Sequence, residues 1–417
     1  MYPTVRDPLV SMPPTRTGRW PRASRNVLML GLTSLFTDIS SEMMTAVLPL
    51  YFVLELRMTP FQFGVIDGLY QGVSAAVRVA SGFVADAGQR HKLVASVGYA
   101  LSTACRLGLL VAGQSWSALT AVLMLDRIGK GIRTAPRDAL ITLSSRREAL
   151  GEAFGVHRAL DTVGAMIGPV AAFAVLALLP GAYDVVFVVS LVFAVIGLSV
   201  IVLFVQNRQE AEVVAAGTGV RRRFREVAAN RQLRRVLTAG GLLGTLTASD
   251  ALIYLLVQRQ GSVAATVFPL LYVGTAVVYL LLAVPFGRLA DRVGRRRLFV
   301  WGHFAIVSVY ALLLWQPVLS MAGVLLAVGL VGVYYAATDG VLAALAGGVL
   351  PAGHMSTGQA LVSTVWAVAR LLAATMFGAC WTVWGAEGAL QLFLVGMLAS
   401  VAAAFLVLRN LDASPAE

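Results

Sequence analysis

Charged residues are scarce in this chain. Asp, Glu, Lys and Arg make up 13% of its 417 residues, whereas 58% are hydrophobic. Soluble domains carry roughly 25% charged residues, so a soluble fold of this size would lack the polar side chains needed to cover its surface. The deficit excludes an ordinary soluble protein and indicates an integral membrane protein.

Cysteine is also rare, and the motifs of common enzymes are missing. The two cysteines, Cys105 and Cys380, each lie inside an apolar run, which is typical of small buried hydrophobic residues and gives no disulfide framework. The sequence has no Gly-x-x-x-x-Gly-Lys-Ser/Thr loop for ATP, no nucleophile motif and no metal-ligand cluster. We therefore expect no enzymatic activity, no bound metal and no cofactor.

The net charge of +12 comes almost entirely from arginine, because Lys92 and Lys130 are the only lysines. A basic chain can indicate a nucleic-acid partner. Here, however, the arginines form short runs between long apolar stretches, which is the pattern that orients membrane helices. We expect these runs to meet membrane lipid and no nucleic acid.

Long apolar stretches dominate what remains. A helix needs about 20 apolar residues to cross the hydrocarbon core of a bilayer. Twelve stretches reach that length, and polar or Pro/Gly residues separate most neighbours. They are 27–54, 61–85, 93–113, 117–143, 152–179, 184–206, 234–257, 264–287, 298–316, 319–349, 356–382 and 388–408. The sequence predicts an all-α integral membrane protein with twelve transmembrane helices.

One long polar segment, 207–233, divides these stretches six and six. We predict a disordered cytoplasmic tail over 1–26, a six-helix bundle over 27–206, a cytoplasmic linker over 207–233, a second six-helix bundle over 234–409 and a short tail over 410–417. The arginine runs fall on one side of the membrane in this topology. The positive-inside rule therefore predicts that both termini are cytoplasmic. We expect the protein to lie in the inner (cytoplasmic) membrane of the cell.

The two predicted halves share an internal repeat. The run from Gly82 to Lys92 follows the second stretch, and a similar run from Gly287 to Arg297 follows the eighth. The second run reads Gly-x-x-x-Asp-Arg-x-Gly-Arg-Arg-Arg, which resembles the signature loop of the major facilitator superfamily. In the first run Ala87 replaces the expected basic residue. The resemblance implies two pseudo-symmetric halves, and it assigns a gating loop. Its residues are Gly82, Asp86, Arg90, Gly287, Asp291, Arg292, Gly294 and Arg295.

The two loop aspartates have a physical role in this reading. With the N-terminus inside, stretches 152–179 and 356–382 begin at the cytoplasmic face, where their helix ends carry partial positive charge. Asp86 and Asp291 can meet those ends, and so latch the halves together while the cytoplasmic side is shut. Plain helix capping is the alternative.

Several ionisable residues fall inside the predicted membrane helices. Such residues cost about 2.5–3.5 kcal/mol on insertion scales and indicate function by default. Asp38 and Glu42 lie one turn apart on one helix face, so both cannot ionise easily. Arg127 and Gly131 resemble an Arg-x-x-x-Gly element that the superfamily links to proton coupling. The candidate proton-coupling residues are Asp38, Glu42, Arg127, Asp126, His157 and Asp161. A static ion network that fixes helix register is the alternative.

A glycine motif on the fifth stretch bears on direction of transport. Gly164, Gly168 and Pro169 resemble the Gly-x-x-x-Gly-Pro element of proton-linked exporters, although Ala171 and Ala172 stand where exporters often repeat glycine. The glycines permit close helix contact, and the proline removes one backbone hydrogen bond and bends the helix.

Together these features predict a monomeric secondary transporter that moves a small-molecule substrate, most consistently by proton-coupled export as an antiporter. The candidate substrate-binding residues are Arg158, Asp250, Arg106, Arg370 and Tyr254. The intramembrane arginines would also suit proton-coupled import of an anion, since arginine binds carboxylates and phosphates bidentately. A membrane sensor that kept the fold without transport is a third possibility.

Overall fold

The computed structural model describes residues 24–70, 72–73, 77, 90–113, 115–145, 150–207, 226–261, 263–350 and 355–409. Most of the predicted N-terminal tail, the C-terminal tail, most of the linker, and the loop residues Gly82 and Asp86 lie outside the described residues. Every regular element within the described ranges is a helix, and these ranges contain no strand.

The helices follow one another along the chain with short connections. The elements are α1 (Arg25–Leu50), a π-helical turn η1 (Tyr51–Glu55), α3 (His91–Val111), α4 (Trp116–Leu143), α5 (Leu150–Leu178), α6 (Tyr183–Phe204), α8 (Arg231–Thr245), α9 (Asp250–Gln260), α10 (Pro269–Val293), α11 (Arg295–Trp315), α12 (Met321–Gly347) and α13 (Met355–Leu408). Residues 60–70 form a further helical segment, which lies between η1 and α3 along the chain.

Eight helical segments of the described chain are long and apolar enough to cross a membrane. They are His91–Val111, Glu152–Leu178, Tyr183–Phe204, Arg231–Gln260, Pro269–Val293, Arg295–Trp315, Met321–Gly347 and Leu361–Leu408. Large apolar side chains are exposed on their outer faces, including Leu203 on α6 and Leu281 on α10. The prediction of an all-helical, multi-pass membrane protein is confirmed, whereas the count of twelve spans stays a prediction.

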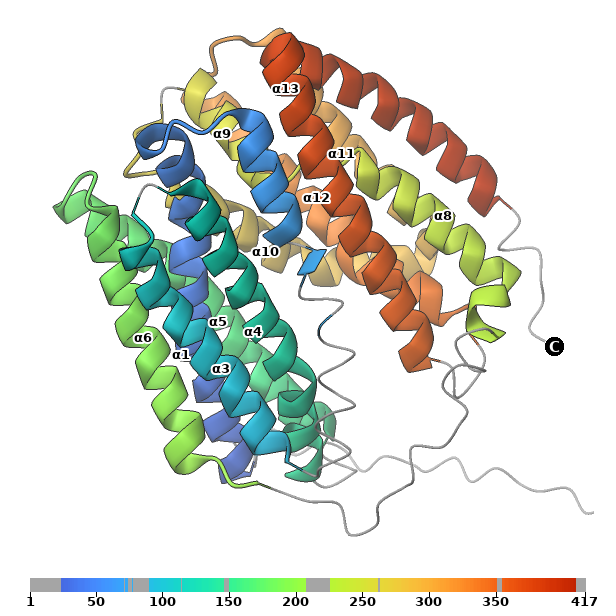
Figure 1. The fold of residues 1–417 in the computed structure, drawn as a ribbon. Helices are drawn as coiled ribbons and strands as arrows, with labels where there is room; N and C mark the ends of the chain where they lie inside the picture. The colour runs from blue at the N-terminus through green and yellow to red at the C-terminus, as the bar shows by residue number, and fades with distance from the viewer. Residues whose placement is uncertain are drawn as a thin grey trace, which may run out of the picture.

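The helices form two groups that meet along one interface (Figure 1). In the first group, α1 packs against α5 and α6, and α3 packs against α4 and α6. In the second, α8 lies along α13, while α12 packs against α10 and α11. The groups are joined mainly where α10 contacts α5 and where α1 contacts α9 and α10.

Glycines bring α5 against α1. A Cβ added at Gly164 would lie 2.5 Å from the Leu35 carbonyl oxygen, and one added at Gly168 would lie 2.8 Å from the Ile39 carbonyl oxygen. No larger residue fits without moving a helix, because backbone atoms cannot yield. The helix α5 continues through Pro169 without interruption.

The seventh predicted stretch, 234–257, is broken in the structure. It forms α8 and α9, which are separated by residues 246–249. The Tyr310 hydroxyl accepts a hydrogen bond from the Ala248 amide at 2.7 Å and donates one to the Leu246 carbonyl at 2.9 Å. Backbone groups freed inside a membrane protein need such partners. The break places Asp250 in the first turn of α9, directly after its N-cap Ser249.

One glycine divides the last helix. α13 is interrupted at Gly385, where φ is 76°. That left-handed conformation is readily adopted only by glycine. The turn separates the two stretches that the sequence predicts over 356–382 and 388–408.

Candidate functional site

Two adjoining cavities lie where the two groups of helices meet. Their volumes are about 190 and 240 Å³. Asp250, Tyr272 and Tyr335 line both, so the cavities share a wall formed by α9, α10 and α12. The first group of helices supplies the opposite wall, which includes Thr45 and Tyr70 in one cavity and Glu42 and Pro169 in the other. A site enclosed by two helix groups is typical of carriers whose halves move against each other.

The shared wall carries a polar cluster. The Tyr335 hydroxyl lies 2.7 Å from both carboxylate oxygens of Asp250 and donates to this carboxylate. A guanidinium nitrogen of Arg370 lies 3.7 Å from Asp250 and donates a 3.4 Å hydrogen bond to the Tyr335 hydroxyl oxygen. The helix N-terminus of α9 also favours a carboxylate at this position. The structure therefore brings together Asp250 and Arg370, two of the predicted substrate-binding residues.

Tyr254, a third predicted substrate-binding residue, lines the larger cavity. Its hydroxyl lies 2.5 Å from the Thr275 hydroxyl, and its ring meets the Tyr272 ring edge to face at 4.7 Å. The tyrosine rings thus form a continuous aromatic surface on this side of the cavities.

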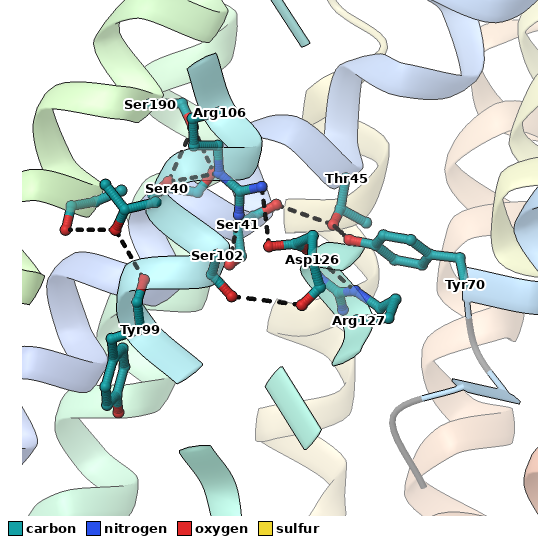
Figure 2. Close-up of polar contacts among 12 residues, drawn as sticks. Ser40, Ser41, Thr45, Tyr70, Tyr99, Ser102, Arg106, Asp126, Arg127 and Ser190 are labelled. Atoms are coloured by element: carbon teal, nitrogen blue, oxygen red, sulfur yellow. Dashed lines mark hydrogen bonds and ion pairs between the residues drawn. The ribbon is translucent and has the colours of Figure 1, made fainter. Parts of the chain in front are cut away.

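A buried ion cluster occupies the interior of the first group (Figure 2). Asp126 pairs with Arg106 at 3.1 Å and with Arg127 at 2.5 Å, and the three side chains are at most 6% exposed. Arg106 also donates to the hydroxyls of Ser40 and Ser41. The structure thus places Arg106, a predicted substrate-binding residue, away from both cavities, between α1, α3 and α4.

Arg127 closes this cluster toward the cavity. Its guanidinium lies 3.8 Å from the centre of the Tyr70 ring, and the Tyr70 hydroxyl is 2.9 Å from the Thr45 hydroxyl. Tyr70 and Thr45 line the smaller cavity, so they separate the guanidinium from that space. The cation is held by an acid on one side and an aromatic face on the other.

A second cluster joins three helices of the first group. The carboxyl groups of Asp38 on α1 and Asp161 on α5 lie close enough to act on each other, and the charges of Lys130 and Arg133 also act on Asp38. Two carboxyl groups this close cannot both ionise easily. Arg137 on α4 lies 4.0 Å from Asp161 and donates to the Ser34 hydroxyl, and that hydroxyl lies 2.9 Å from Nε2 of His157. Three predicted proton-coupling residues, Asp38, His157 and Asp161, are therefore in one place.

Lys130 lies between the two clusters, and sequence reasoning assigned it no role. The charges of Asp38, Glu42 and Arg127 all act on its ammonium group. Glu42 itself lines the larger cavity, so Lys130 links the cavity electrostatically to Asp38. The sequence could have indicated a role for Lys130, because it lies one turn after Arg127 and the chain has only two lysines.

Other predicted residues lie at the periphery. Arg158 is exposed on α5, and its charge acts on Asp339 and Tyr279, which line the larger cavity from the second group. Sequence reasoning also missed three cavity residues, because one aromatic or acid among many apolar residues gives no pattern. They are Asp67, which the sequence did not suggest at all, and Tyr272 and Tyr335, which the sequence offered only among several aromatics that could line a cavity and for which packing was the favoured role.

The described part of the gating loop is open to solvent. Asp291 is 64% exposed and pairs at 3.0 Å with Arg295, one turn further along the chain. Within the described residues no ion pair joins Asp291 to α5 or α13. Gly294 ends α10 with a φ of 102°, a conformation that requires glycine. Gly287 and Arg292 lie at the same helix end, and Arg90 precedes α3.

The two helix groups also touch along a glycine-lined contact between the segment 60–70 and α13 (Figure 1). A Cβ added at Gly68 would lie 2.7 Å from the Leu371 carbonyl oxygen, and added Cβ atoms at Gly64 and Gly378 would meet the carbonyl oxygens of Ala374 and Pro60. Backbones this close leave no path between the helices. We call this contact the glycine seam.

Known proteins share this architecture. A family model described as Major Facilitator Superfamily matches residues 30–374. An uncharacterized MFS-type transporter of Methanocaldococcus jannaschii is 27% identical over 367 residues, which cover 86% of this chain and 89% of that protein. Two solved structures also resemble this one, at identities that establish the fold alone.

The first of these structures is a bacterial homologue of the human lysosomal transporter Spinster, inward-facing and unoccupied. It matches with a TM-score of 0.75 at 15% identity, over 96% of this chain and 100% of that one. The second is the nucleoside transporter NupG, with a TM-score of 0.77 at 11% identity, over 91% of this chain and 99% of that one.

The buried ion cluster generates a stability prediction. Asp126→Asn leaves Arg106 and Arg127 buried without their counter-charge, so we expect a loss of about 3–5 kcal/mol of folding free energy. Thermal unfolding of the purified protein in detergent measures this loss. Asp184→Asn, which changes an exposed carboxylate at the start of α6, serves as the control and should shift stability by less than about 0.5 kcal/mol. Equal stability of both variants would contradict the assignment.

Proposed function

The chain belongs to the major facilitator superfamily, and we propose that it is a proton-coupled secondary transporter that exports a small solute by alternating access. The observation that carries this proposal is the pair of cavities that lie between the two groups of helices, with acidic side chains on both walls. The full proposal includes twelve transmembrane helices in two six-helix halves. It places the protein in the inner membrane of the cell, with both termini in the cytoplasm. One chain supplies both walls, so a monomer suffices.

The glycine seam and the gating loop support alternating access. In the proposed orientation the seam lies on the outer side of the cavities and Asp291 lies on the cytoplasmic side. The seam is packed through backbone contacts, whereas Asp291 is solvent-exposed and bonded within its own loop. This combination is that of an inward-facing carrier: the outer side is shut, and the cytoplasmic latch is released.

Proton coupling rests on the second cluster of the first half. We place the coupling proton between Asp38 and Asp161, where a small change in the distance between α1 and α5 changes how tightly it is held. Lys130 transmits the charge of Glu42, which lines the cavity, toward Asp38. A solute entering the cavity therefore changes the field at the shared proton, and this exchange is the coupling that an antiporter needs.

The position of the arginines favours export over import of an anion. Arg106 and Arg127 are held by Asp126, and Tyr70 separates Arg127 from the cavity. Within the described chain Arg370 is the only basic residue that lines either cavity. The cavities themselves disfavour a sensor that has lost transport, since a scaffold has no need for an enclosed, charged space between its halves.

Proton flux in proteoliposomes tests the coupling. The vesicles contain a trapped pH-sensitive dye and receive cationic, neutral and anionic solutes in turn. We expect at least one solute to evoke proton movement in the wild type, and Asp38→Asn or Asp161→Asn to reduce it by at least about tenfold, which corresponds to losing roughly 1.4 kcal/mol of coupling.

Asp184→Asn is the control for proton flux and should leave it unchanged. Proton movement that survives both Asp38→Asn and Asp161→Asn at the wild-type rate would show that these carboxyl groups carry no coupling proton.

The glycine seam generates a second prediction. Gly64→Leu places a side chain against the Ala374 carbonyl, so the inward-facing state loses stability. Overpacking costs about 1–3 kcal/mol, which changes a two-state population roughly 5- to 150-fold. Spin labels at Thr59→Cys and Glu387→Cys, in a chain with both native cysteines replaced by serine, measure the outer separation. In Gly64→Leu we expect a larger population with a long distance between the two spin labels than in the protein with Gly64.

Gly155→Leu is the matched control, because nothing lies within 4 Å of an added Cβ there. Identical distance distributions for Gly64→Leu and Gly155→Leu would exclude the seam as the outer gate.

A further inference from the structure

We infer that the paired cavities bind an organic cation, an aromatic or alkyl amine, with Asp250 as its charge partner and Tyr272 as its aromatic face. The inference deepens the proposed function, on which it rests for the assumption that the cavity ligand is the transported solute. It concerns the class of solute and makes no use of the direction of transport.

The charge of the walls carries the first step. Four carboxyl groups of the described chain line the cavities: Glu42, Asp67, Asp250 and Asp339. They face one guanidinium group, that of Arg370. The walls remain net negative even when two of the four carboxyl groups hold a proton. A cation entering this space is attracted, while an anion meets repulsion that the low dielectric strengthens.

Arg370 does not reverse this balance, because it is already committed. Its charge is acted on by Asp67 from the first half as well as by Asp250 from the second, and it donates to the Tyr335 hydroxyl. An anion would have to displace two carboxylates to reach it. Arg106, Arg127 and Arg133 are 2–5% exposed, and none of them lines either cavity. Arg137 and Arg158 are more exposed but also lie outside both linings, so no second guanidinium is in place for a bidentate anion.

Asp250 is prepared to receive a cation. Tyr335 donates to both of its oxygens and fixes the carboxylate in orientation. Arg370 is 3.7 Å away, beyond a good charge-assisted hydrogen bond of about 2.7–2.9 Å. The carboxylate is 26% exposed and lines both cavities, so a ligand ammonium can approach it from either one.

The aromatic wall is a second observation, independent of the carboxylates. The Tyr272 ring lines both cavities, and its hydroxyl is buried without a hydrogen-bond partner among the described residues. A buried polar atom without a partner is uncommon in a finished site and indicates a missing ligand or water. Ring faces attract cations and tolerate many shapes, which suits a carrier of amines.

The volumes limit the size of the solute. Each cavity is smaller than the roughly 300–1,000 Å³ of sites for drug-sized ligands. One cavity of about 190 Å³ or 240 Å³ therefore holds a small amine, and a longer amphiphilic cation would occupy both.

Equilibrium binding to the purified protein in detergent tests the inference without requiring transport. The probes have one shape and three charges: N-methyl-phenylpyridinium, methylbiphenyl and biphenyl carboxylate. Competition against radiolabelled N-methyl-phenylpyridinium measures each affinity in the wild type. We expect saturable binding of the cation, at least about tenfold tighter than that of the neutral or anionic probe.

Variants locate the site. Asp250→Asn and Tyr272→Leu should each weaken binding of the cation by about tenfold, while Tyr272→Phe, which keeps the ring, stays within about threefold of wild type. Asp184→Asn is the control and should bind as the wild type does.

Tighter binding of the anionic or neutral probe in the wild type would overturn the inference, even if a variant failed to fold. Cation binding that is indifferent to both Asp250→Asn and Tyr272→Leu would also overturn it. Proton-driven transport of an anion or a neutral solute would contradict the inference and agree with the proposed function as a transporter. Tight cation binding without proton flux would support the inference and contradict the proposed proton coupling.

Discussion

Every ionisable side chain inside this protein must find an opposite charge or share a proton, because the hydrocarbon around it supplies neither. Asp126 meets this constraint with two arginines, whereas Asp38 lies beside the carboxyl group of Asp161 and feels the charge of Lys130. The two solutions have opposite consequences. The ion cluster around Asp126 is complete and at most 6% exposed, so it holds α3 and α4 together. In the proposed mechanism the carboxyl pair of Asp38 and Asp161 holds the proton that is exchanged.

The same constraint divides the buried charges into those paired inside a helix group and those that line the cavities. Three of the four buried arginines of the described chain, Arg106, Arg127 and Arg133, lie in the first group. Asp126 neutralises part of their charge, and the rings of Tyr70 and Tyr99 cover the guanidinium groups of Arg127 and Arg133. The cavities are left with more carboxyl groups than guanidinium groups. Net positive charge in the sequence therefore coexists with a negative binding space, and composition alone would have suggested the opposite solute.

Close backbone contact is the second recurring feature. Gly164 and Gly168 fix α5 against α1 within one helix group, whereas the glycine seam joins the two groups. Contacts within a group keep the carboxyl pair aligned. In the proposed cycle the contacts between groups are lost when the outer side opens, so their packing would set the balance between the two states.

Hydropathy was sufficient to predict much of the fold. Long apolar stretches and arginine runs identify a multi-pass helical protein, and charge inside those stretches singles out Asp38, His157 and Asp161 as candidates. That these three meet between α1 and α5 is seen only in the structure. The break between α8 and α9 was missed, because residues 246–249 are not distinctly polar and the break depends on the distant Tyr310 hydroxyl. Local sequence cannot report a partner supplied by another helix.

Side-chain direction was the other limit of the sequence. Arg106 and Arg370 are both single arginines in apolar stretches, yet one is sealed against Asp126 and the other lines a cavity. Tyr272 and Tyr335 were indistinguishable from packing residues until the helices were placed. Which charge faces which space is decided by helix rotation, and periodicity within one helix does not fix the rotation relative to the others.

Infrared difference spectroscopy of the purified protein tests the central claim most directly, because a protonated carboxyl group absorbs apart from a carboxylate. The account predicts a protonated carboxyl band that is present in the wild type, disappears as the pH is raised, and is missing from the protein with Asp38→Asn. A spectrum in which all intramembrane carboxyl groups are permanently ionised would contradict it.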